Sequence, residues 1–208
     1  FTLPSVKLTF KKSKIECEGT EALVAHFPKL SFKTKLNFKP WDIQEEAIKS
    51  WIENEHLGTI SLPTGSGKTK IGEMAIHDIG LLRTLVVAPT VELLHQWRAS
   101  IIKDLGVPED KVGIYWGGEK QIRDITIITF QSGHRKISEE QEDVDEDVDE
   151  ESEKLVEKII SLSEESALII LDEGHHAPAP VFQRIMVGVK SPYRLSLTAT
   201  PYREDKND

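Results

Sequence analysis

The sequence predicts an α/β fold built on a parallel β-sheet that helices cover on both faces. From residue 40 onward, short apolar runs of strand length alternate with longer segments whose apolar residues recur at helical spacing. The runs at 85–87 and 168–171 are apolar without alternation, as expected of strands buried on both faces. Strands that alternate with helices of this length indicate βαβ crossovers and therefore parallel pairing.

Residues 1–39 predict a small β-rich appendage ahead of the main domain. Val6, Leu8 and Phe10 alternate with polar residues, and a similar alternation returns at 30–38. The first forty residues carry eight lysines against three glutamates, so these strands have a lysine-bearing face. Such a face is typical of a solvent-exposed strand or a protected sheet edge, and contact with DNA is the alternative interpretation.

The main domain is expected to cover residues 40–208. Its first helix is indicated by Ile43, Ala47, Trp51 and their neighbours, which recur at helical spacing. The predicted elements, in order, are helix 41–54, strand 58–63, helix 68–80, strand 83–88, helix 91–104, strand 124–129, helix 153–163, strand 167–172, helix 180–187 and strand 193–199. In such a sheet the functional loops follow the carboxyl ends of the strands.

Charge and composition leave several kinds of partner open. The net charge is −9, but the acidic insert at 138–153 holds eleven of the 35 acids, and the remaining 24 acids face 26 bases. Like charges with few apolar residues predict a solvated loop there, with a flap that competes with DNA as the alternative. No apolar run is long enough to span a bilayer. A lone cysteine, Cys17, favours a reducing compartment, cytoplasmic or nuclear.

Residues 60–69 have the pattern of a phosphate-binding loop, in which a strand enters glycine-rich turns and then a helix. Gly65 and Gly67 permit positive φ and let backbone N–H groups approach anionic oxygens. Lys68 is expected to reach the β- and γ-phosphates of ATP, and the Thr69 hydroxyl to ligate Mg²⁺. Leu62 stands where the full pattern has its first glycine.

A second element, at 167–176, delivers two carboxylates at the end of a buried strand. Asp172 is expected to hold Mg²⁺, and Glu173 to orient and deprotonate the attacking water. A helix cap is the common alternative for an isolated Asp-Glu pair. It is disfavoured here because a phosphate loop precedes the pair in an α/β pattern. The adjacent His175 and His176 point in diverging directions and do not predict a zinc site.

Several segments together resemble the motifs of superfamily 2 helicases and translocases, over residues 40–205. Pro-Thr-Gly-Ser-Gly-Lys-Thr at 63–69 is similar to motif I, and Asp-Glu-Gly-His at 172–175 to motif II in its DExH form. Residues 88–97 resemble motif Ia, 129–132 a later DNA-contacting motif, and 197–201 motif III. Gln44 lies where the family places a glutamine that recognises adenine. The resemblance implies a RecA-like P-loop NTPase domain.

The resemblance also implies roles for individual residues. The nucleotide would be bound by Gln44, Thr64, Gly65, Ser66, Gly67, Lys68 and Thr69, and Mg²⁺ by Thr69 and Asp172. Catalysis would fall to Lys68, Asp172 and Glu173, and coupling to strand movement to His175, Ser196, Thr198 and Thr200. DNA would be contacted by Pro89, Thr90, Gln131 and Ser132, on phosphates and sugars rather than base edges.

A narrower resemblance follows motif III. The triplet Arg203, Glu204 and Asp205 resembles a hallmark of XPB-type DNA repair helicases, especially archaeal ones, where it is implicated in opening DNA. The appendage at 1–39 would then correspond to part of that family's damage-recognition region. One departure is Trp41, which stands where the family often has an arginine. The acidic insert also has no expected counterpart.

The expected activity is that of an ATP-dependent DNA helicase, acting on a single strand or fork independently of sequence. In this superfamily a second RecA-like domain supplies arginines to the transition state, so the chain alone is expected to bind nucleotide but to be nearly inactive. The alternatives are the ATPase motor subunit of a restriction or nuclease complex, with a nuclease partner, and a non-hydrolysing nucleic-acid-binding module. Intact Lys68, Thr69, Asp172 and Glu173 disfavour the second of these.

Overall fold

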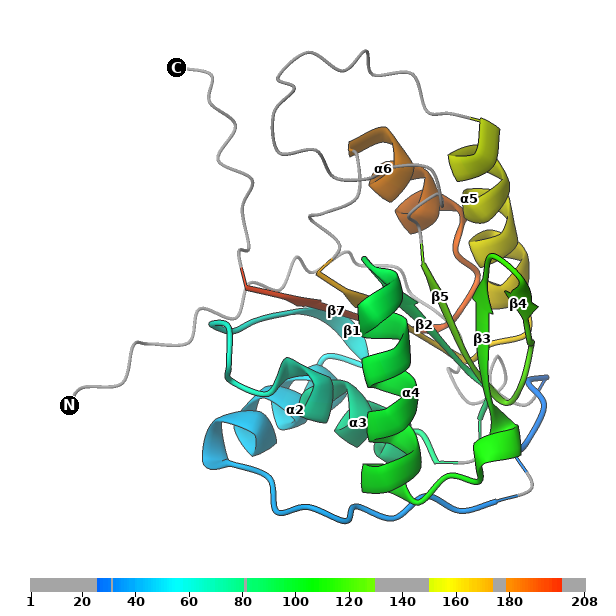
Figure 1. Cartoon of the computed structure of the whole chain (residues 1–208). Coiled ribbons are helices and arrows are strands. Elements are labelled where there is room, and N and C mark those ends of the chain that lie inside the picture. The colour runs from blue at the N-terminus through cyan, green and yellow to red at the C-terminus, as the bar shows by residue number, and fades with distance from the viewer. Residues whose placement is uncertain (1–25, 31, 81, 130–149, 174–178, 200–208) are drawn as a thin grey trace, which may run out of the picture.

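The computed structural model describes residues 26–30, 32–80, 82–129, 150–173 and 179–199 (Figure 1). The strands are β1 (Leu57–Ser61), β2 (Thr84–Ala88), β3 (Val112–Trp116), β4 (Glu119–Lys120), β5 (Ile125–Thr129), β6 (Leu168–Asp172) and β7 (Tyr193–Thr198). The helices are α2 (Asp42–Glu53), α3 (Lys68–Asp78), α4 (Val91–Leu105), the 3₁₀ turn η1 (Glu109–Lys111), α5 (Glu150–Ser163) and α6 (Ala179–Gly188).

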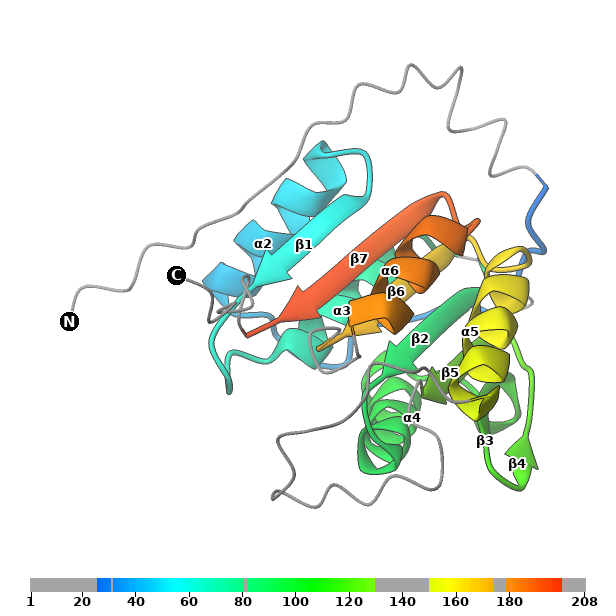
Figure 2. The same cartoon turned by 90° about the horizontal axis from the view of Figure 1, so that it is seen from above.

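All strands of the described residues belong to one seven-stranded sheet in the order β1-β7-β6-β2-β5-β3-β4 (Figure 2). Every pairing is parallel except that of β3 with β4, which is antiparallel. The predicted α/β fold with a parallel sheet is therefore confirmed. The carboxyl ends of β1, β7 and β6 come together at one edge, and the loops that follow them meet there.

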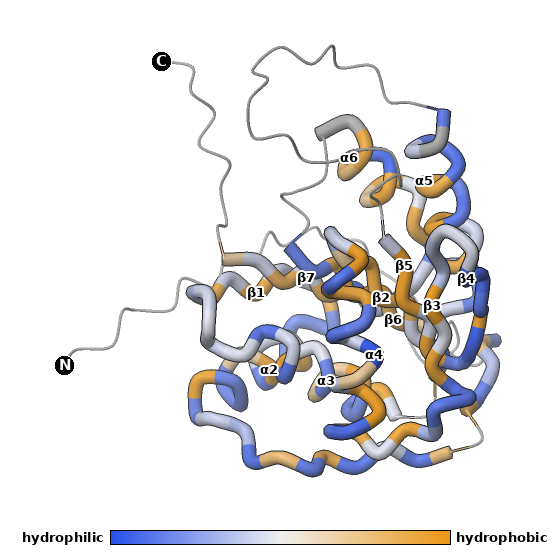
Figure 3. Tube along the Cα trace, viewed as in Figure 1, coloured by the Kyte–Doolittle hydropathy of each residue, from blue (hydrophilic) through white to orange (hydrophobic). Residues whose placement is uncertain are grey.

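Helices cover both faces of the sheet because consecutive strand residues point to opposite sides. In β2, Val86 packs in the core formed with α2, α3 and α4, whereas Leu85 and Val87 pack in the core formed with α5 and α6. Figure 3 shows the hydrophobic residues concentrated along the central strands. The two hydrophobic cores cover the two faces of the sheet, so the loops that follow the strands remain for polar functional residues.

The segment that precedes α2 differs from the prediction. Within 26–30 and 32–39 the backbone forms only an isolated bridge between Lys29 and Leu82, so the expected strands at 30–38 are wrong. The alternating apolar residues, among them Phe32 and Phe38, instead pack on the core beneath α2, α3 and α4. Backbone hydrogen bonds from Lys35 N to Leu105 O (3.0 Å) and from Asn37 N to Asp104 O (2.8 Å) attach the segment to the end of α4. Residues 1–25 lie outside the described residues.

Three further differences concern the main domain. The sheet includes β3 and β4, which the periodicity did not predict. The acidic insert is predicted as a loop and the helix after it to span 153–163, but α5 begins at Glu150, so the loop prediction is wrong for residues 150–152. Glu150 and Glu153 are paired there with Lys154 (2.7 Å) and Arg184 (2.7 Å). Residues 138–149 lie outside the described part. Within the described residues, no helix is both long and apolar enough to cross a membrane.

Candidate nucleotide-binding site

The loop between β1 and α3 forms an anion cradle. Gly65 (φ 82°) and Gly67 (φ 76°) adopt left-handed backbone conformations that favour glycine. Gly67 is also the residue that precedes the first turn of α3, where backbone N–H groups have no partner within the helix. A Cβ at Gly67 would lie 2.4 Å from the side-chain nitrogen of Gln44, so any other residue there would displace the Gln44 amide.

Two carboxylates face this cradle from the end of β6. The Lys68 ammonium lies 2.9 Å from Glu173 Oε1 and donates a hydrogen bond to the Leu62 carbonyl oxygen at 3.2 Å. The structure thus brings the predicted lysine and the predicted acidic pair together at the carboxyl edge of the sheet. Leu62 itself is buried at the end of β1, so its side chain belongs to the core and its carbonyl to the site.

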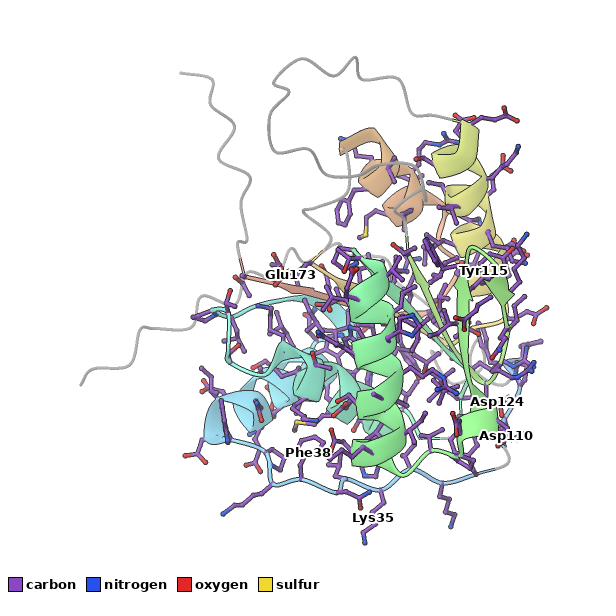
Figure 4. The ribbon with its side chains drawn as sticks, viewed as in Figure 1. Lys35, Phe38, Asp110, Tyr115, Asp124 and Glu173 are labelled. Atoms are coloured by element: carbon purple, nitrogen blue, oxygen red, sulfur yellow. The ribbon has the colours of Figure 1, made fainter. Side chains whose placement is uncertain are left out.

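Glu173 is held in a specific position by β7 (Figure 4). Its backbone N–H donates to Leu197 O at 2.8 Å, and its Oε2 accepts from the Ala199 N–H at 3.0 Å. Its φ of 46° is unusual for a residue other than glycine and costs free energy, so the surrounding bonds must maintain it. The expected coupling residues Ser196 and Thr198 lie on the same strand, β7. The carboxylate is therefore connected directly to the segment that carries motif III.

Asp172 is almost fully buried, and its Oδ2 accepts a hydrogen bond from the Trp97 indole at 2.8 Å. Burial raises the pKa of Asp172 to about 6; the Trp97 hydrogen bond opposes that shift, and the neighbouring Glu173 charge reinforces it. The raised pKa means that the charged carboxylate destabilises the fold. A bound cation would relieve this cost, as expected of a metal ligand.

Asp172→Asn is expected to stabilise the chain near neutral pH by about 2–3 kcal/mol, because each pKa unit corresponds to about 1.4 kcal/mol. The folded chain favours the protonated form of Asp172, which adds to the free energy of unfolding. This contribution is fully present below the ordinary pKa of 3.8 and is lost as pH rises through about 6. The gain from Asn should therefore shrink as pH falls below 6. Urea unfolding of the wild type and the variant, at one pH above and one pH below that value, measures the difference in their free energies of unfolding. Asp110→Asn, at an exposed position, is the control. A gain that is equal at both pH values would contradict the prediction.

Gln44 joins α2 to the phosphate loop. Its Oε1 accepts from the Trp41 backbone N–H at 3.0 Å, and its Nε2 donates to Ser66 O at 2.9 Å. An amide carbonyl has two lone pairs and an NH₂ group has two hydrogens, so one acceptor and one donor position remain. That pair of positions matches the donor and acceptor of an adenine edge. Trp41, at the start of α2, is 58% exposed.

The other predicted residues are placed as follows. Thr90 caps α4 by accepting from Leu93 N at 3.4 Å, and Pro89 O accepts from Thr129 Oγ1 at 3.3 Å, so the ends of β2 and β5 adjoin. Thr64 lies in the loop and Thr69 in the first turn of α3. Gln131, Ser132, His175, Thr200, Arg203, Glu204 and Asp205 lie outside the described residues.

The residues present fit a nucleotide–magnesium complex. The Ser66 hydroxyl is buried in the phosphate loop and has no hydrogen-bond partner among the described residues, as expected of a group that a ligand completes. No cluster of three or more His, Cys, Asp or Glu side chains in the described ranges is arranged to hold a metal. A Mg²⁺ site that relies on one or two protein oxygens and on phosphate oxygens needs no such cluster.

Sequence reasoning missed the role of Trp97. The resemblance to motif Ia includes Trp97 but assigns it no role, although its spacing with Leu94 and Ile101 places it on the buried face of α4. That spacing predicts burial, but the partner of its indole lies 75 residues away along the chain and no local pattern identifies it.

The arrangement of a phosphate cradle, lysine and paired carboxylates at the carboxyl edge of a parallel sheet defines a P-loop NTPase domain. The chain belongs to the family described as type III restriction enzyme, res subunit, whose model matches residues 37–203. The chain is 34% identical over 205 residues to the DNA 3'-5' translocase XPB2 of Sulfurisphaera tokodaii, covering 99% of this chain and 40% of that protein. It is 33% identical over 148 residues to the DNA 3'-5' helicase XPB of Mycobacterium tuberculosis, covering 71% of this chain and 24% of that protein.

Solved structures show the same fold. The UvsW helicase from bacteriophage T4 superposes with a TM-score of 0.59 at 14% identity, covering 86% of this chain and 58% of that one. The Hef helicase domain of Pyrococcus furiosus superposes with a TM-score of 0.55 at 21% identity, covering 80% of this chain and 34% of that one. The predicted resemblance to superfamily 2 helicases, and to the XPB type in particular, is therefore confirmed. The chain spans 40% or less of the length of the two relatives described above.

Proposed function

We propose that this chain is the ATP-binding first half of an ATP-dependent DNA helicase or translocase of the XPB type that acts in DNA repair. The observation that carries the proposal is the 2.9 Å contact between Lys68 and Glu173, next to Asp172, at the mouth of the glycine cradle. The XPB-named relatives support the substrate class, and the fold agrees with solved helicases.

The chain's own residues would divide the work of hydrolysis. The N–H groups of the cradle and of the first turn of α3 would bind the phosphates, and Lys68 would bind the terminal one. Asp172 and Thr69 would hold Mg²⁺, which supplies positive charge to the phosphate oxygens when bound. Glu173 would orient water for in-line attack and accept its proton. Gln44 would select adenine.

Glu173 serves as the base only after Lys68 leaves it. An ion-paired carboxylate is a weaker proton acceptor because the ammonium stabilises its charged form. A terminal phosphate that attracts Lys68 would release Glu173 at the position where water must bind. The hydrogen bond from Ala199 N to Glu173 Oε2 then keeps the carboxylate in place. Glu173 therefore need not move when Lys68 leaves it.

The binding part of the proposal is tested by calorimetric titration of the chain with ATP in the presence of Mg²⁺. We expect one site, and binding that weakens when Mg²⁺ is chelated. Absence of any nucleotide binding by a folded chain would overturn the proposal. The DNA part is tested by titration with single-stranded DNA at rising salt, where affinity should fall because phosphate contacts release counterions.

Gln44→Ala is expected to weaken ATP binding roughly tenfold, because it removes a donor and an acceptor from the adenine edge. Binding of GTP should change less than about twofold, since the phosphate cradle is untouched. Competition against a fluorescent ATP analogue measures both nucleotides. Ser50→Ala, at a position on α2 whose hydroxyl bonds only to Glu46 O, is the matched control. An equal loss for ATP and GTP would show that Gln44 only supports the loop through Ser66.

A second candidate is the ATPase motor subunit of a restriction or nuclease complex. Two observations favour it: the description of the matching family, and a TM-score of 0.53 to the Type ISP restriction-modification enzyme LlaGI at 16% identity. The XPB-named relatives match at 34% and 33% identity, which favours the repair motor. Co-purification of the native protein with a nuclease that cleaves only when ATP is hydrolysed would favour the second candidate instead.

A further inference from the structure

The feature of interest is the contact between helix α4 and the expected magnesium ligand. The Trp97 side chain is 1% exposed, and its indole Nε1 donates a hydrogen bond of 2.8 Å to Asp172 Oδ2. An indole has one donor and no acceptor, so it matches a carboxylate oxygen and stabilises the charged form. This is a short, fully buried hydrogen bond to the residue on which metal binding is expected to depend.

The indole ring is fixed by the elements around it. Leu94, Ile101 and Leu105 lie on the same buried face of α4, so the helix orientation is set by the core. The ring also packs directly against α3, because a Cβ at Gly72 would lie 2.5 Å from its Cη2 atom. A ring held between α4 and the helix of the phosphate loop cannot turn away from Asp172 without disturbing both.

We propose that Trp97 is a positioning residue for magnesium, which holds the Asp172 carboxylate in the orientation that the metal requires. The proposal rests on the proposed ATP site and names a residue to which the resemblance assigns no role at the metal. A carboxylate has about four lone-pair positions and the indole occupies one, so capacity for the metal or its water remains. Partners that orient metal-binding residues contribute strongly to metal affinity.

Trp51 shows what a purely structural tryptophan does in the same core. It is 0% exposed, and its indole donates to the Arg194 carbonyl oxygen at 3.0 Å, away from the expected metal site. The two residues share burial, ring size and one indole hydrogen bond, and they differ in the group that accepts it. Trp51→Phe is therefore the matched control for Trp97→Phe.

The test uses the 208-residue chain and measures the Mg²⁺ concentration that half-saturates its enhancement of ATP binding. Trp97→Phe keeps an aromatic ring but removes the donor, so this concentration should rise roughly 10–100-fold, while ATP binding with Mg²⁺ chelated should change less than about twofold. Trp51→Phe should leave both values unchanged. Equal Mg²⁺ dependence in the two variants would overturn the proposal. Absence of Mg²⁺-dependent ATP binding in the wild type would overturn the proposed function as well.

A second measurement needs no substitution at Trp97. In the chain labelled with ¹⁵N-tryptophan there are four indole N–H signals, and Trp41→Phe, Trp51→Phe and Trp116→Phe assign that of Trp97 by elimination. We expect the Trp97 indole proton to lie downfield, and to shift when Mg²⁺ is added to the ADP-bound chain while the Trp51 signal stays in place. A Trp97 signal that does not respond to Mg²⁺, in a chain that binds it, would overturn the proposal even if Trp97→Phe failed to fold.

Discussion

The 208-residue chain alone is expected to hydrolyse ATP about 10³–10⁵-fold more slowly than a full-length relative, even with DNA present. The reason is charge: the transition state of phosphoryl transfer needs an arginine beside the terminal phosphate. In the described residues every arginine is engaged elsewhere. Their hydrogen-bond acceptors are Glu165 for Arg83, Glu109 for Arg98, the Ile122 carbonyl for Arg123, Glu153 for Arg184 and the Val189 and Ser191 carbonyls for Arg194.

The measurement is phosphate release with and without single-stranded DNA, beside the full-length Sulfurisphaera tokodaii relative as the reference. The chain must bind ATP under the same conditions, so that slow turnover reports a missing catalytic group and not an empty site. DNA-stimulated turnover within about tenfold of the reference would mean that the chain supplies its own transition-state cation. In that case the proposal that a second half completes the site would be wrong.

Lys68→Ala is expected to weaken ATP binding roughly 100-fold, because a charge-assisted hydrogen bond to a phosphate contributes about 1.5–3 kcal/mol. The affinity for AMP should fall little, because AMP has no β- or γ-phosphate for the ammonium to reach. The ammonium lies beside the cradle, between the loop carbonyl of Leu62 (3.2 Å) and Glu173 (2.9 Å), where a terminal phosphate would meet it. Calorimetry with both nucleotides measures the difference.

The control for that experiment is Lys49→Ala, which removes an exposed lysine that pairs with Glu53 on α2 (3.8 Å). Its ATP affinity should equal that of the wild type. Circular dichroism and thermal unfolding check that both variants fold. Unchanged ATP binding in folded Lys68→Ala would place the nucleotide elsewhere on the chain and remove the main support for the proposed function.

Local patterns in the sequence were sufficient for most of the sheet and for the phosphate loop. The non-alternating apolar residues of β2 and β6 predict their burial, and the glycines at 65 and 67 predict the turn, because each signal is contained in a few consecutive residues. Strands β3 and β4 were missed because Gly113 interrupts the apolar run of β3 and weakens its strand pattern, and because β4 has two residues.

Local sequence patterns do not predict contacts between segments that are far apart in the chain. The alternation at 30–38 suggested strands, but those apolar residues pack on a core that other elements provide, and core packing overrides a short alternating pattern. Likewise the pairing of Lys68 with Glu173 and of Trp97 with Asp172 depends on how β6 is placed between β2 and β7. The sequence predicts that Lys68 and Glu173 share an edge but not which of their atoms meet, and it predicts no partner for Trp97.

The Lys68–Glu173 ion pair also bears on what the proposed site would do before ATP binds. With no nucleotide bound, the group proposed to bind the terminal phosphate and the group proposed to activate water neutralise each other. Neither role could begin alone, since the arrival of the phosphate is what would separate them. When the product leaves, the ion pair would re-form and return the site to its starting state without any external signal. In the proposed mechanism this single contact would set the order of events: ATP binds first, water is then activated, and the ion pair re-forms last.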